Sequence, residues 1–122
     1  MGPSHHAYLR KCSISGASEL QTTVGHMGVD AGARDALLAT GLFDTTTQQV
    51  DEEEHSIEMH LPFLAFVLAS SPGAMVVPIL VGQLSDSSAA QYAQTLQPFF
   101  EDPGTLFVIS RYFFFRASVA CI

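Results

Sequence analysis

The chain has 122 residues, 48% of them hydrophobic and 14% charged, which suits one folded domain and excludes a disordered chain. Twelve acidic residues against five basic ones give a formal net charge of −7 at pH 7, and only Arg10 and Lys11 are adjacent, so we expect no nucleic-acid partner. The longest apolar run, Leu61 to Ala69, is too short to span a bilayer, and we see no signal peptide. Cys12 and Cys121 lie far apart and form no C-x-x-C motif. A cytoplasmic protein without a membrane partner is therefore expected.

The first half of the chain predicts short strands around one capped helix. Residues 12–15 form a short candidate strand. Asp30 is placed to cap a helix that runs through residues 36–38 and ends at Gly41. Residues 45–49 favour a strand or a loop, because threonine is common in strands.

The middle of the chain, residues 51–70, predicts an interrupted helix. Asp51 and Glu54 have the spacing of a capping box at its start. Pro62 deprives the Glu58 carbonyl of its usual helical partner, so we expect the helix to kink or restart there.

The last third predicts two buried strands around another helix. Residues 74–81 are an apolar run typical of a buried strand, although the proline within it removes one hydrogen-bond donor. A helix capped at Ser85 or Asp86 follows, then a turn at residues 102–104, then a second buried strand at residues 105–109. Continuous apolar strands alternating with helices predict an α/β fold, with a mostly parallel sheet covered by helices on both faces. Such a sheet usually has more strands, so we expect an incomplete one.

Two adjacent imidazoles, His5 and His6, follow a Gly-Pro turn near the start of the chain. Imidazole is the commonest side-chain ligand of metals in proteins. Neighbouring residues point in different directions, so at most one of the two enters a given site. The alternative is an exposed polar loop or the remains of a cloning tag.

A second cluster of titratable residues lies in the predicted interrupted helix. His55 and Glu58 are three residues apart and share one helix face. His55 and His60 are about 140° apart around the helix, so they cannot chelate one ion as the pair of a zinc protease does. We predict that His55, Glu58 and His60, with His6, contribute to a pocket. The alternative is a capped helix with a satisfied histidine.

Three stretches occur in the order and spacing of the Memo family (mediator of ErbB-driven cell motility), which the chain resembles. They are G-P-S-H-H at residues 2–6, E-H-S-I-E-M-H-L-P-F at residues 54–63 and V-P-I-L-V-G at residues 77–82. Residues 102–110 continue the likeness. The resemblance spans less than half of a typical family member, so residues 1–110 are interpreted as a partial Memo-like α/β domain.

The resemblance implies a fold similar to class III extradiol dioxygenases, of which this chain would be an incomplete α/β sandwich. Family members are described as binding copper or iron through two histidines and one cysteine, and as taking part in redox chemistry. His5 falls on the family's ligand in G-P-S-H. The second histidine is expected upstream in A-P-H-A-G and the cysteine downstream, so we expect this chain alone not to bind either metal tightly. The alternative is a non-catalytic module that recognises phosphotyrosine peptides, which the family is also described as binding.

The end of the chain departs from the family. After Ser110 the family continues S-D-F-x-H, whereas here Tyr112 stands for the aspartate and Phe115 for the histidine. Neither can serve as a carboxylate base or an imidazole ligand. Residues 111–122 are therefore interpreted as a divergent apolar tail, either translated from beyond an exon end or evolved in an inactive relative.

Overall fold

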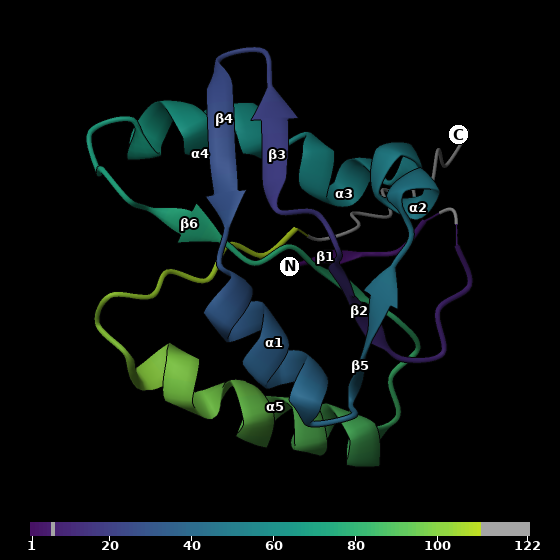
Figure 1. Cartoon of the computed structure of the whole chain (residues 1–122). Coiled ribbons are helices and arrows are strands. Elements are labelled where there is room, and N and C mark those ends of the chain that lie inside the picture. Colours follow the sequence, from purple (N-terminus) through teal and green to yellow (C-terminus); the bar gives the residue numbers. More distant parts are fainter. Residues whose placement is uncertain (6, 111–122) are drawn as a thin grey trace, which may run out of the picture.

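Two small β-sheets organise the chain in the computed structural model, which describes residues 1–5 and 7–110 (Figure 1). The first sheet has four strands in the order β1-β7-β2-β5, and the second has three in the order β3-β4-β6. Three of the five strand pairs are parallel, which confirms the α/β class predicted from the sequence. The strands are β1 (Gly2–Pro3), β2 (Cys12–Ser15), β3 (Glu19–Thr22), β4 (Gly25–Val29), β5 (Phe43–Thr46), β6 (Met75–Val76) and β7 (Ile79–Val81).

Helices cover both faces of the first sheet. Helices α1 and α5 pack on the face that carries Cys12 and Ile14, while α2 and α3 lie on the face that carries Ser13 and Ser15. Helix α4 packs against the hairpin of β3 and β4. The helices are α1 (Ala31–Ala39), α2 (Gln48–Glu53), α3 (His55–Glu58), α4 (Leu61–Leu68) and α5 (Asp86–Glu101).

The core lies between the first sheet and helices α1 and α5, because successive residues of β2 point to opposite faces. Ile14 is fully buried there among apolar side chains of all three elements. The ring of Tyr92 in α5 meets Phe43 edge-on, with centroids 5.1 Å apart. Its hydroxyl donates to the Leu42 carbonyl at 2.8 Å and accepts from the Cys12 amide at 3.0 Å. One aromatic residue thus ties α5 to two strands of the sheet.

Several local predictions are confirmed. Residues 12–15 are β2, and Asp30 caps α1 by accepting a hydrogen bond from the Ala33 amide at 3.0 Å. Gly41 follows the helix with a φ of 71°, a conformation that favours glycine. Ser85 caps α5 through a reciprocal bond with Ser88.

Other predictions are wrong. The apolar run at residues 74–81 is not one strand, because Pro78 has no amide to donate and the chain changes sheets there, from β6 to β7. Residues 45–49 contain the end of β5 and the start of α2 rather than one segment. Residues 105–109 are not a strand, although the amino group of Met1 donates to the Val108 carbonyl at 2.6 Å, so this segment runs beside β1.

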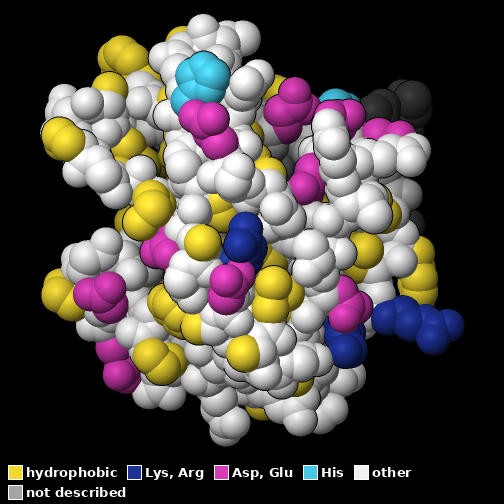
Figure 2. All heavy atoms as spheres, in the orientation of Figure 1, with side chains coloured by type: hydrophobic (Ala, Val, Ile, Leu, Met, Phe, Trp, Pro, Cys, Tyr) yellow, Lys and Arg dark blue, Asp and Glu magenta, His cyan; other side chains and the backbone are white. Residues whose placement is uncertain are grey.

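Basic side chains are few on the face drawn in Figure 2: near the middle they lie beside acidic ones, and the others lie at the right edge. Lys11 lies 3.7 Å from Asp44, and Arg34 lies 2.9 Å from Asp35. Within residues 1–5 and 7–110, no helix has the length and apolar content needed to cross a membrane.

Candidate functional site

Glu54 is the buried charge around which the candidate site is built. Its backbone is extended, with φ −97° and ψ 107°, and it separates α2 from α3. Its side chain turns inward, where it is 2% exposed, and caps α3 by accepting a hydrogen bond from the Ser56 amide at 3.1 Å. The helix break at this point therefore delivers a carboxylate into the interior.

The predicted capping box of Asp51 and Glu54 is wrong. Thr47 caps α2, so Asp51 lies inside that helix instead of at its start. The carboxylate of Asp51 accepts hydrogen bonds from Ser15 at 2.6 Å and from Thr46 at 2.7 Å, and so holds α2 to the first sheet. Glu54 caps the next helix, which begins one residue later.

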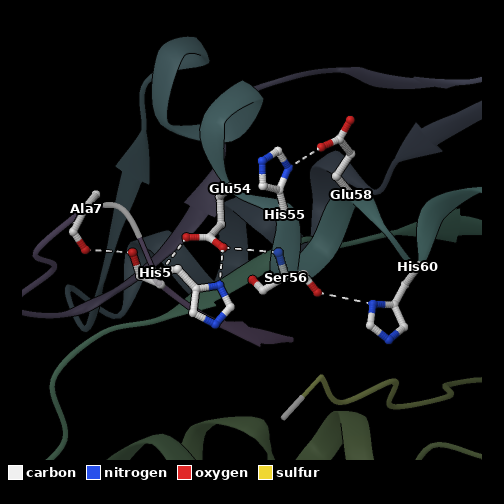
Figure 3. A network of polar contacts seen from close by, with 8 residues as sticks. His5, Ala7, Glu54, His55, Ser56, Glu58 and His60 are labelled. Carbon is white, nitrogen blue, oxygen red and sulfur yellow. Dashed lines mark hydrogen bonds and ion pairs between the residues drawn. The ribbon is translucent and has the colours of Figure 1, made fainter. Parts of the chain in front are cut away.

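His5 contacts Glu54 twice, across 49 residues of sequence. The backbone amide of His5 donates to Glu54 Oε2 at 2.6 Å, and the ring Nδ1 lies 2.9 Å from Oε1 (Figure 3). The His5 side chain is 30% exposed, so the ring stands at the edge of the interior with its Nδ1 side held by the buried carboxylate.

The hydrogen bonds that Glu54 accepts decide its charge state. Burial raises the pKa of a carboxyl group, but here the bonds from His5 and Ser56 outweigh it and lower the pKa of Glu54 from 4.5 to about 2. Glu54 is therefore an ionised carboxylate at any physiological pH.

His55 and Glu58 form the predicted pair, with Nδ1 2.7 Å from Oε2. Their side chains are 63% and 59% exposed, and neither lines the cavity described next. The pair faces solvent because His55 and Glu58 lie on the side of α3 opposite Ser56, which is buried.

His60 lies apart from His5, beyond the other end of α3 (Figure 3). Its Nδ1 is 3.2 Å from the Ser56 carbonyl oxygen. It lines a largely apolar cavity of about 510 Å³, together with Leu61 and Leu64 of α4. The structure thus brings together His5 with Glu54 and His55 with Glu58, but it does not join these pairs with His60 in one pocket. His6, Tyr112, Phe115 and the tail at residues 111–122 lie outside the described residues.

Sequence reasoning missed the role of Glu54. Its spacing from Asp51 predicts only a capping role, whereas its partner His5 lies 49 residues earlier in the chain. The one available signal was that both partners belong to the stretches that carry the Memo resemblance.

The contact of His5 with Glu54 is of the kind that metal-binding histidines make, because the N–H of their other ring nitrogen usually donates a hydrogen bond to a carboxylate or carbonyl. The described residues do not supply a full ligand set. Among residues 1–5 and 7–110, no group of three His, Cys, Asp or Glu side chains is placed to hold a metal ion. Burial also raises the pKa of the Cys12 thiol, which keeps that group in its protonated, poorly ligating form.

The Memo-like protein family matches residues 1–115. Protein MEMO1 of Danio rerio is 40% identical over 111 residues, and Protein MEMO1 of Homo sapiens is 37% identical over 111 residues; each alignment covers 90% of this chain and 37% of the relative. Protein memo-1 homolog of Caenorhabditis elegans is 42% identical over 110 residues, or 90% of this chain and 31% of the relative. The chain thus spans about a third of the length of these relatives, and it belongs to the Memo family.

Proposed function

We propose that this chain is part of a Memo-like, dioxygenase-like redox protein in which His5 is one ligand of a copper or iron ion. The observation that supports this is the pairing of His5 Nδ1 with the buried Glu54 at 2.9 Å. A bound copper or iron ion would supply one-electron or oxygen chemistry. The further ligands would come from parts of the family protein that this chain does not contain.

The residues of this chain have a holding role in that proposal. Glu54 fixes the ring of His5, and its own position is fixed by the start of α3. Ser4 donates to the Ala7 carbonyl at 2.7 Å, which shapes the loop that carries His5.

A competition titration tests whether the further metal ligands lie outside this chain. Copper(I) and iron(II) are titrated against a chelator in the presence of the chain or of its His5→Ala variant. One imidazole does not hold either ion tightly, so we expect no submicromolar site and the same result for both proteins. A submicromolar site that disappears in His5→Ala would show that the chain completes the metal site by itself.

The second candidate function is recognition of a phosphotyrosine peptide. The observation that favours it is a cavity of about 440 Å³ lined by Arg10, Lys11 and residues from the first two turns of α5, among them Ser88 and Gln91. Lys11 already donates to the Gly41 carbonyl at 3.0 Å, which leaves Arg10 as the main candidate for a phosphate. Fluorescence anisotropy should then show binding of a labelled phosphotyrosine peptide that Arg10→Ala weakens. Equal binding of the unphosphorylated peptide would exclude this function.

We also propose that the protein acts in the cytoplasm. Cys12 is a buried free thiol, which suits a reducing compartment. Fluorescence microscopy of the tagged protein tests this, and secretion into the medium would contradict it.

A further inference from the structure

We propose that Glu54 is a positioning residue that fixes His5 as the Nδ1–H tautomer, so that Nε2 carries the lone pair that a metal ion would take. The part that concerns the metal rests on the proposed function. The tautomer is a property of this chain and can be measured without any metal.

The proton is assigned by counting donors and acceptors. An ionised carboxylate only accepts hydrogen bonds, and a neutral imidazole has one N–H and one bare nitrogen. Glu54 Oε1 lies 2.9 Å from His5 Nδ1 and also accepts from the Ser56 amide. A bare Nδ1 would place two lone pairs against each other at that distance. The contact is therefore favourable only when Nδ1 carries the proton.

The Glu54 carboxylate is held in place by its other hydrogen bonds, so it cannot rotate Oε1 away from Nδ1. Oε2 of Glu54 accepts from the backbone amide of His5 at 2.6 Å while Oε1 faces the ring, so one side chain holds both the backbone and the imidazole of His5. Glu54 is 2% exposed, and water has little access to replace these bonds. The His55–Glu58 pair has the same two chemical groups but is more than half exposed, so it serves as the matched comparison.

A Glu54→Ala variant should release the tautomer, because it removes the acceptor that faces Nδ1. Glutamine is a less decisive change: with its oxygen at the Oε1 position it would keep the bonds from the Ser56 amide and from Nδ1–H, and only the His5 amide would face the NH₂ group. Without the carboxylate a bare Nδ1 no longer faces a lone pair, so the Nε2–H tautomer becomes accessible.

The experiment is a long-range ¹H–¹⁵N correlation spectrum of the histidine rings, assigned with His5→Ala. It is recorded at about pH 8.5, roughly two units above the ordinary histidine pKa. We expect the Nδ1–H tautomer to dominate for His5 in the unaltered chain. In Glu54→Ala the Nε2–H share of His5 should rise, while the control Glu58→Ala should leave His5 unchanged.

Two outcomes would overturn the proposal: an Nε2–H or evenly mixed His5 in the unaltered chain, or an unchanged tautomer in a folded Glu54→Ala variant. Circular dichroism establishes whether the variant is folded. If it is not, the unaltered chain and Glu58→Ala still decide. A chain with Nδ1–H His5 whose family protein binds no metal would contradict the proposed function and leave this tautomer assignment standing.

Discussion

Replacing Glu54 by alanine is expected to lower the free energy of unfolding by about 3 to 5 kcal/mol. The substitution leaves the amides of His5 and Ser56 without an acceptor, and each unmade buried bond costs about 1 to 3 kcal/mol. The bond from the Ser56 amide is also the N-cap of α3, so the loss of the cap is included in this cost. Urea denaturation followed by circular dichroism measures the loss.

Glu58→Ala is the control for this substitution, because it removes a carboxylate that also contacts a histidine but lies in solvent. Its expected cost is within about 0.5 kcal/mol. If Glu54→Ala costs no more than Glu58→Ala, Glu54 does not organise this part of the fold.

The same carboxylate predicts how stability depends on pH. The pKa of Glu54 is depressed from 4.5 to about 2 in the folded chain, so the unfolded state binds the proton more readily. Its stabilising contribution, about 3 kcal/mol for this shift, is fully present above pH 4.5 and is lost as the pH falls toward 2. The urea midpoint of the unaltered chain should therefore fall more steeply over that range than the midpoint of Glu54→Gln. An equal fall of the urea midpoint in both proteins over this pH range would contradict the depressed pKa of Glu54.

Gly82→Ala is expected to cost about 3 kcal/mol, because Gly82, the residue after β7, lies directly against the backbone of the segment that leads into β2. A methyl group at Gly82 would overlap the Lys11 carbonyl and would lie 2.7 Å from the Leu9 carbonyl oxygen. Both are backbone atoms, and Leu9 also accepts a hydrogen bond from the Gln83 amide at 2.8 Å, so relief requires moving a strand. Thermal and urea denaturation measure the effect.

Gly32→Ala provides the comparison within the same chain. Gly32 lies in α1, and the nearest atom to an added methyl group is a side-chain oxygen of Asp30 at 3.4 Å. Alanine favours the helix over glycine, so we expect this variant to gain about 0.5 kcal/mol. Similar stabilities for Gly32→Ala and Gly82→Ala would contradict the close contact of Gly82 with the backbone of Leu9 and Lys11.

Local features of the fold were predictable from the sequence because their causes are local. Asp30 and Ser85 carry side-chain oxygens directly before helical segments, and Gly41 can adopt the positive φ that ends α1. Pro62 accounts for the restart of the helix at α4, where it occupies the first turn.

The features that were not predicted correctly depend on contacts between residues distant in sequence. Residues 74–81 are uniformly apolar, and composition does not reveal that the segment contributes to two different sheets. The hairpin of β3 and β4 was not predicted, because its two strands contain only two buried residues, Met27 and Val29, both in β4. The contact of His5 with Glu54 joins two motifs that were each interpreted alone.

The central claim is that His5 is a metal ligand whose site is completed by the rest of a Memo protein. The most direct test is a copper(I) competition titration of a chimera, in which residues 2–110 of this chain replace the matching segment of Protein MEMO1 of Danio rerio. The parent, the chimera and its His5→Ala and His55→Ala variants are titrated together, with folding checked by circular dichroism. We predict that the parent and the folded chimera both bind copper(I), that His55→Ala changes nothing, and that His5→Ala lowers the affinity by more than the roughly 10- to 100-fold that an outer partner contributes. A folded chimera that binds copper(I) equally well with and without His5, or that fails to bind it where the parent does, would contradict the account.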